Sequence, residues 1–369
     1  MILSIIAIIL LFASLVILHE LGHFIAARRN GVEVDEFGIG FPPKLYGRKV
    51  GKTEYTLNLL PLGGFVRMRG EDGEDETKGS FGAASLKAKS KILLAGVGMN
   101  LVTAYVILLV LCLSGMPGLI LDTFGPKFLH PIVSQQKSLL LTDVVAGTPA
   151  AKAGIVRNDY LISGNGTALT DEATLKSFTK DNAGKLVTLV VRHRGSERTI
   201  NLTLNSKQSD QGYLGVAGQQ MFKVRYSFVD AIVAAGWFTG SLFVATIVGV
   251  FMLIIHIPAL IFGLFSAAIP SAANQASGPV GIVYILGSAL VLGWAYIFLI
   301  MANIAVALAA FNVLPLPALD GGRLAVLLTE RVTKRRFSPD AEAKYHFFGF
   351  VALIGLMLVV TVYDIRKFF

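Results

Sequence analysis

The sequence predicts a polytopic α-helical membrane protein with a membrane-associated β-loop and one small α+β domain outside the membrane. Hydrophobic residues make up 54% of the 369 residues and charged residues only 15%, whereas about 25% of a soluble domain is charged. The hydrophobic residues lie in long blocks, which is typical of a chain that spans a bilayer several times. One stretch of short apolar pieces broken by glycine and proline predicts the β-loop, and one mixed polar region predicts the α+β domain.

The net charge of +9 could suggest a polyanionic partner, but the basic residues are placed as in a membrane protein. Six lysines and arginines lie between Arg323 and Lys344, and others flank the apolar blocks. Basic residues at the ends of spans record orientation, so we expect the lipid bilayer as a partner and no nucleic acid. The single Cys112 lies in an apolar block, which excludes a disulfide within the chain and indicates a packing residue.

Residues 1–27 are expected to form the first membrane-spanning helix. The block is apolar up to His19, and Arg28 and Arg29 would end it at the cytoplasmic face. A signal peptide is the alternative, but the block has no basic start and no convincing cleavage site. The N-terminus is therefore expected outside the cytoplasm.

Residues 28–91 are expected to form a cytoplasmic-side loop that contains the β-loop at 37–69. Within 37–69, prolines and glycines separate short apolar pieces, which is typical of strands and turns and not of a helix. A second membrane-spanning helix is expected at 92–115, and it leads outward.

Residues 135–222 are expected to form the domain outside the membrane. A turn and a short helix at 147–155 are followed by Asp159-Tyr160-Leu161-Ile162 and a glycine turn. This pattern resembles a PDZ domain, present as a single copy, and an unrelated small α+β domain is the alternative. The strand-like runs of the segment are Leu139–Val145, Leu186–Val191 and Thr199–Leu204.

Three further apolar segments follow. Residues 228–272 are too long for one simple span, so a hairpin bent near Pro258 or a re-entrant or surface segment would fit. Residues 281–322 are expected to form a membrane-spanning helix that ends in a motif rich in proline and glycine. Residues 347–363 are expected to form the last membrane-spanning helix.

The strongest chemical signal is His19-Glu20-Leu21-Gly22-His23, an HExxH motif at the end of the first apolar block. On a helix, His19 and His23 share one face and can bind one zinc ion, while Glu20 can take a proton from a water that the metal activates. Ionisable side chains are costly inside a bilayer, so their presence at this depth indicates function. A His/Glu cluster that only anchors the helix is the alternative.

Two histidines leave zinc short of a protein ligand, and Phe24–Gly31 contains neither histidine nor acid. The candidate is Asp320 in the segment Asn312–Gly322, where two prolines end a helix and two glycines allow a tight turn. Irregular backbone at membrane depth is tolerated only where protein buries it, which favours a functional Asp320 over a plain turn.

Together these motifs resemble the site-2 protease family of intramembrane zinc metalloproteases, especially its bacterial RseP-like members. That family pairs HExxH with Asn-x-x-Pro-x-Pro-x-Leu-Asp-Gly in a later span, and every fixed position of the second motif is present in Asn312–Gly321. The similarity reaches from end to end of the chain, through Leu60–Val66, Gly212–Val216 and Ser277–Gly281.

The resemblance implies an intramembrane zinc metalloendopeptidase that acts on single-span membrane proteins, such as anti-sigma factors or signal peptide remnants. It implies Zn²⁺ bound by His19, His23 and Asp320, with Glu20 as the catalytic acid/base. It also implies that the β-loop holds the unwound substrate strand and that the PDZ-like domain excludes substrates with a bulky ectodomain.

Four residues are implied at the substrate-binding surface by the same resemblance: Asn312, Asn100, Gly63 and Gly64. Asn100 matches a family Gly-Pro-x-x-Asn element in which Val97 stands in place of the usual proline.

The proposed ligands restrict how the chain crosses the membrane. Asp320 can meet the histidines only if residues 228–269 cross an even number of times, so that 281–311 runs inward. The resemblance implies a bacterial cell (inner) membrane, and this topology puts the active site near the cytoplasmic side and the PDZ-like domain outside. The basic loop 323–346 would be cytoplasmic.

Two other functions are compatible with parts of the sequence. A catalytically inactive membrane scaffold with a PDZ domain would be expected to lose Glu20 or a ligand, and all are present. A metal transporter would spread acidic or histidine residues over several spans, whereas the second and third apolar blocks contain almost none, with His256 as the candidate.

Overall fold

The computed structural model describes residues 2–71, 75–133, 137–193, 195–207, 212–264, 277–335 and 337–368. The chain divides into two compact units. Unit 1 comprises Met1–Leu108, Ala235–Gly287 and Ile300–Phe369, and unit 2 comprises Leu109–Ala234 and Ser288–Leu299.

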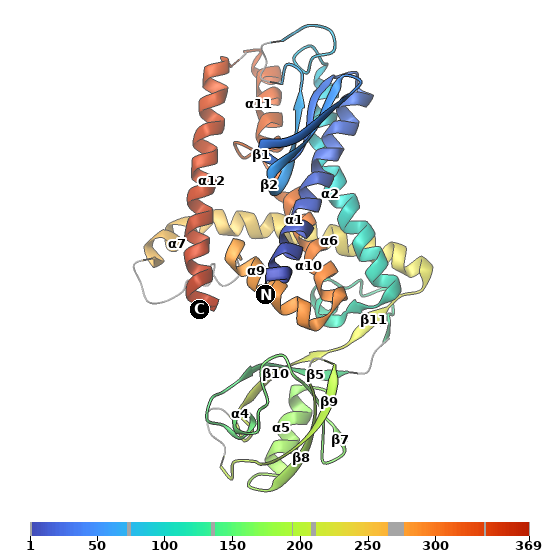
Figure 1. Cartoon of the computed structure of the whole chain (residues 1–369), viewed down its shortest axis with the longest axis vertical. Coiled ribbons are helices and arrows are strands. Elements are labelled where there is room, and N and C mark those ends of the chain that lie inside the picture. The colour runs from blue at the N-terminus through green and yellow to red at the C-terminus, as the bar shows by residue number, and fades with distance from the viewer. Residues whose placement is uncertain are drawn as a thin grey trace. The chain divides into compact units, whose positions relative to one another are not determined.

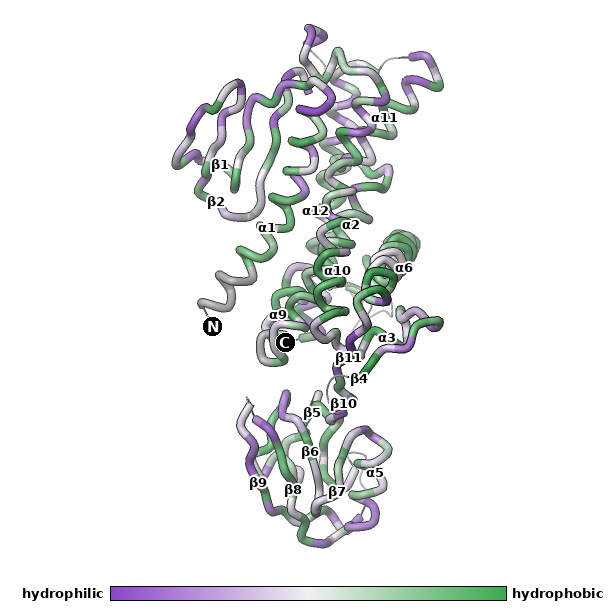
Figure 2. Tube along the Cα trace, turned by 90° about the vertical axis from the view of Figure 1, so that its right-hand side faces the viewer, coloured by the Kyte–Doolittle hydropathy of each residue, from purple (hydrophilic) through white to green (hydrophobic). Residues whose placement is uncertain are grey.

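Within the described part of the chain, five helices are long and apolar enough to cross a membrane. They are α1 (Ile2–Arg29), α2 (Leu86–Ser114), α6 (Phe228–Ile255), α10 (Trp294–Val313) and α12 (Pro339–Phe368). Figure 2 shows these helices mostly in the green of hydrophobic residues. The prediction of a polytopic α-helical membrane protein that also contains β-structure is confirmed.

Helices α1 and α2 approach each other closely through small residues. A Cβ on Gly22 of α1 would lie 2.5 Å from the carbonyl oxygen of Ala95 on α2. α2 is continuous from Leu86 to Ser114 through the buried Val97. Because valine keeps the backbone N–H that proline lacks, the helix passes this position without a break.

The β-loop is a hairpin of β1 (Val34–Val50) and β2 (Thr53–Met68). Each long strand has two pairing segments, or arms, which are 34–39 and 44–50 in β1 and 53–58 and 64–68 in β2. The arm 53–58 pairs on one side with 44–50 and on the other with 36–39. The arm 64–68 pairs with 34–39, and no strand among the described pairs lies on its other side. The arm 64–68 is therefore an edge.

The two ends of the hairpin have different surroundings. At its base, the buried side chains of Phe37, Val66 and Met68 join Phe24 of α1 and Ile92 of α2 in one apolar cluster. Large apolar side chains farther along the hairpin are exposed: Leu45, Tyr46, Leu57 and Leu59. Such exposure indicates contact with lipid or substrate rather than with water.

Helix α6 runs across the direction of α12, as Figures 1 and 2 both show. It ends at Ile255, and the seven-residue α7 (Ile257–Gly263) follows after His256. α7 alone extends about 10 Å at ~1.5 Å per residue, which is less than a bilayer core. Residues 265–276 lie outside the described residues, so the even number of crossings stays a prediction.

Several contacts join α12 to the rest of unit 1, and two of them lie near its C-terminal end. The buried carboxylate of Asp364 accepts the backbone N–H of Gly281, 2.8 Å away, near the start of α9 (Pro279–Leu292). A Cβ on Gly281 would lie 2.7 Å from Asp364 Oδ1, which explains a glycine there. The Tyr363 hydroxyl donates to the Leu260 carbonyl of α7 at 2.6 Å.

Unit 2 contains an antiparallel sheet with the order β10-β5-β6-β8-β9, and β7 pairs with β6. Its elements are β5 (Ser138–Val144), α4 (Pro149–Lys152), β6 (Tyr160–Gly164), β7 (Thr167–Ala168), α5 (Glu172–Asp181), β8 (Leu186–His193), β9 (Ser196–Thr203) and β10 (Val216–Met221). The sheet and α5 enclose an apolar core that includes Leu161, Phe178 and Leu189. This is an α+β fold, and its assignment as a PDZ domain stays a prediction.

The remaining elements of unit 2 are short. A three-stranded sheet joins β3 (Met116–Pro117), β11 (Lys223–Arg225) and β4 (Ile132–Val133), and η1 (Gly118–Ile120) and α3 (Leu121–Phe124) follow β3. Cys112 is buried, and its carbonyl accepts the N–H of Tyr226 at 2.8 Å. The cysteine is thus a packing residue.

Candidate metal centre and active site

His19 and His23 lie four residues apart on α1, so both imidazoles leave the same face of the helix. They are buried, with 7% and 6% of their surface exposed. Their Nε2 atoms are 3.1 Å apart. The helix therefore directs two nitrogen ligands at one point inside the protein.

Asp320 is the first residue of α11 (Asp320–Thr333), directly after the turn that contains the two prolines. In this turn Ala318 has a φ of 67°, a left-handed conformation that L-residues rarely adopt. Gly321 and Gly322 are buried, and a Cβ on either would collide with carbonyl oxygens of the turn, those of Leu314 and Leu316. The glycines thus let the turn fold back against the start of α11.

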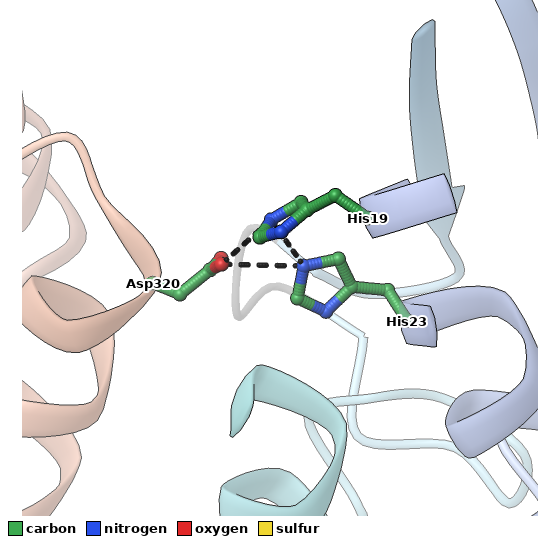
Figure 3. A group of neighbouring side chains, drawn as sticks. All are labelled: His19, His23 and Asp320. Carbon is green, nitrogen blue, oxygen red and sulfur yellow. Dashed lines mark hydrogen bonds and ion pairs between the residues drawn. The ribbon is translucent and has the colours of Figure 1, made fainter. Parts of the chain in front are cut away.

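The three side chains meet in a compact group (Figure 3). Asp320 Oδ2 lies 3.1 Å from His19 Nε2 and 3.2 Å from His23 Nε2, so that the three atoms form a nearly equilateral triangle. Zinc with bonds of about 2.0–2.2 Å keeps tetrahedral ligand atoms roughly 3.3–3.5 Å apart. The triangle therefore fits three vertices of a catalytic zinc site, in which water or substrate takes the fourth.

Helix α2 forms a hydrogen bond with the Nδ1 atom of each imidazole. The Nδ1 of His23 hydrogen-bonds to the carbonyl oxygen of Ile92 at 2.8 Å, and the Nδ2 of Asn100 to His19 Nδ1 at 3.0 Å. Between these two positions, a Cβ on Gly96 would lie 2.6 Å from His19 Cε1 and 2.7 Å from His19 Nε2. Glycine at 96 thus leaves room for the rings.

Glu20 is partly buried and lies beside the edge arm of β2. A Cβ on Gly64 would be 3.8 Å from the Glu20 Cγ, an ordinary van der Waals distance. Gly63 has a φ of 139°, and a Cβ there would be 3.1 Å from Val16 Cγ1. The two glycines therefore bring the strand close to the helix that carries Glu20.

The comparisons with known proteins agree with this geometry. The profile of peptidase family M50 matches residues 7–356. The chain belongs to peptidase family M50. The regulator of sigma-W protease RasP of Bacillus subtilis is 28% identical to it over 449 residues, covering 99% of each chain. Zinc metalloprotease RasP of Geobacillus kaustophilus is also 28% identical, and a Clostridium perfringens protein is 32% identical over 97% of each chain.

Family M50 is the site-2 protease family, so the resemblance found in the sequence is confirmed. The M50 chain is a zinc metalloprotease, as its relatives' names also say. The enzyme class and the cofactor predicted from HExxH are therefore confirmed, while the role of each individual residue stays a prediction.

Two of the predicted substrate-binding residues of the M50 chain have other partners. The Asn312 side chain donates to the Leu308 carbonyl of its own helix at 2.9 Å. Asn100 is fully buried against His19. Their contacts with substrate stay predictions, as do those of Gly63 and Gly64.

Two further contacts near the candidate metal centre were not expected from the sequence. Arg323 of α11 forms an ion pair with Glu71, which follows β2. The Ala318 N–H donates to His346 Nδ1 of α12 at 2.8 Å. Arg323 and His346 both lie in 323–346, which the sequence marks only as a basic loop, and no spacing rule connects either residue to its partner.

Proposed function

We propose that this M50 protease cleaves the membrane-spanning segment of single-span membrane proteins, with Zn²⁺ held by His19, His23 and Asp320. The triangle of two nitrogens and one oxygen is the observation that carries the proposal. Zinc bound there would supply a Lewis acid that polarises the scissile carbonyl and acidifies a water molecule.

Glu20 is proposed as the general base and then the general acid. It lies between the two histidines on α1, and its partly buried side chain is beside the edge arm of β2. In this role its carboxylate takes the proton of the attacking water and then gives it to the leaving amine nitrogen as the C–N bond breaks.

The substrate strand is proposed to add to the edge arm 64–68 of β2. A helical substrate hides its carbonyl groups in hydrogen bonds, so it must unwind before a peptide bond can be attacked. A free sheet edge supplies main-chain hydrogen bonds to such an extended strand. Gly64 places this edge next to Glu20, and Asn312 is proposed to help hold the strand.

Residues 135–222 are proposed to form a PDZ-like domain outside the cytoplasm that excludes substrates with a bulky ectodomain. In unit 2, α5 and residues Gly212–Gly218 line a groove. A groove between a strand and a helix is where PDZ domains add an extended peptide to their sheet. This groove and the strand order around it support the assignment.

The protein is proposed to lie in a bacterial cell (inner) membrane with its active site near the cytoplasmic side. Arg28 and Arg29 end α1, and the basic residues of 323–346 follow α10 and Asp320, as the positive-inside tendency expects of cytoplasmic segments. The proposed substrates are anti-sigma factors or signal peptide remnants, and the name of the Bacillus subtilis relative refers to a sigma factor.

The deciding experiment replaces Glu20 by Gln in the purified full-length protein. The variant should keep zinc, because no ligand atom changes, and should lose cleavage of a single-span reporter. Glu197→Gln, at an exposed position of unit 2 paired with Arg192, is the control and should cleave normally. Cleavage by Glu20→Gln at the wild-type rate would overturn the proposed mechanism.

A further inference from the structure

One face of α2 packs against the two histidines. Ile92, Gly96 and Asn100 are spaced by four residues, so they line up along the helix. Ile92 contributes a backbone carbonyl, Gly96 contributes space, and Asn100 contributes a side-chain amide with no exposed surface. This face therefore contacts both imidazole rings.

The direction of the hydrogen bonds on this face follows from the chemistry of imidazole. A neutral imidazole that binds a metal through Nε2 carries its proton on Nδ1, and that proton needs an acceptor. For His23 the acceptor is the Ile92 carbonyl at 2.8 Å. For His19, the side-chain amide of Asn100 lies 3.0 Å from Nδ1.

An asparagine can present either a donor or an acceptor at the same place. Its Oδ1 and Nδ2 exchange positions when the amide turns by about 180°, and their assignment follows from their partners. With Nδ2 toward His19, the buried Oδ1 of Asn100 has no hydrogen-bond partner in the described part of the chain. Turning the amide brings this unpaired oxygen onto the Nδ1 proton of His19.

We propose that Asn100 is a positioning residue for the metal ligand His19, and that its Oδ1 accepts the Nδ1 proton. The bond holds the ring in the tautomer whose Nε2 lone pair faces Asp320 and His23. Both ligand histidines are then oriented by α2, one through the Ile92 carbonyl and one through Asn100. This inference rests on the proposed ligand set, and it differs from the substrate contact that the family resemblance implies.

The test measures zinc affinity by competition with a chromogenic chelator, using the purified full-length protein in detergent. Asn100→Leu keeps the size of the side chain but removes the acceptor, and its affinity should fall roughly 10- to 100-fold, as for other outer-shell partners. Asn100→Asp keeps an acceptor oxygen and should bind zinc within a few-fold of wild type. In the control Thr103→Val, the lost hydroxyl donates only to Met99 of the same helix, and affinity should not change.

Kinetics on zinc-saturated protein separate this role from substrate binding. A positioning residue changes zinc affinity and leaves the KM for the reporter nearly unchanged. If Asn100→Leu binds zinc like wild type, or if Asn100→Asp loses as much affinity as Asn100→Leu, the inference is wrong. A raised KM with unchanged zinc affinity would identify Asn100 as a substrate contact instead.

Two further variants keep these outcomes interpretable. Asn100→Ala takes the place of Asn100→Leu in the same comparison if the leucine variant does not fold, as judged by circular dichroism and gel filtration. His19→Ala tests the ligand set itself. Zinc loss in His19→Ala together with normal affinity in the Asn100 variants would refute only the role of Asn100. Retained zinc in His19→Ala would refute the proposed site.

Discussion

The guanidinium of Arg323 forms an ion pair with the carboxylate of Glu71, which lies 252 residues earlier in the sequence. Arg323 follows Asp320 by three residues on α11, and Glu71 follows the end of β2 by three. The pair therefore connects the helix that begins with a proposed zinc ligand to the strand that is proposed to hold the substrate.

Replacing Arg323 by Met should lower the kcat/KM for a reporter several-fold while zinc binding is kept. An ion pair in which both side chains are partly exposed stabilises the folded arrangement by about 1 kcal/mol. This energy corresponds to a factor of about five in an equilibrium constant. The control is Lys344→Met, which removes an exposed pair with Asp340 and should have no effect. Combining Arg323→Glu with Glu71→Arg should recover part of the lost activity, and a swap no better than either single variant would contradict this account.

Gly96 and Gly98 of α2 should respond very differently to alanine. A Cβ at 96 would come within 2.7 Å of His19 Nε2, whereas a Cβ at 98 meets no atom within 4 Å. Gly96→Ala should therefore displace the imidazoles and reduce both zinc content and cleavage. Gly98→Ala should keep both and raise thermal stability slightly, because alanine is favoured over glycine in a helix by about 1 kcal/mol. Equal zinc content in the two variants would contradict the geometry.

Asp320→Ala should weaken zinc binding more than the roughly 10- to 100-fold expected for loss of an outer-shell partner, because it removes a ligand atom. Asp340→Ala, at an exposed position of α12, is the matched control and should bind zinc normally. Chelation of zinc from the wild-type protein should abolish reporter cleavage, and added Zn²⁺ should restore it. Unchanged zinc occupancy in Asp320→Ala would remove this residue from the ligand set.

Much of the candidate site could be predicted because its parts follow local rules. His19 and His23 meet through helix periodicity alone, and the prolines before Asp320 end α10 within a few residues of it. The long apolar blocks predicted α1, α2 and α12, since bilayer thickness fixes the length of a span. The block 281–311 was expected as one helix, but it forms α9 and α10, separated by Gly293 with a φ of 106°.

The remaining features depend on tertiary contacts that no local pattern encodes. The partners of Glu71 and of Ala318 lie in distant segments, and the sequence offers only their charge and polarity. The spacing of Gly96 and Asn100 was a usable signal, because i and i+4 share a face, but it did not say that this face lies against His19. The sequence also did not predict that each hairpin strand pairs through two separate arms, since register depends on pairing and not on composition.

The separation of the proposed ligands along the chain has a consequence for biosynthesis. His19 lies in α1, and Asp320 is 301 residues later along the chain. Nascent chains therefore lack the proposed zinc centre until the segment that carries Asp320 has been made and inserted. An enzyme that attacks membrane-spanning segments is in this way kept inactive while its own chain is still being inserted among other new membrane proteins.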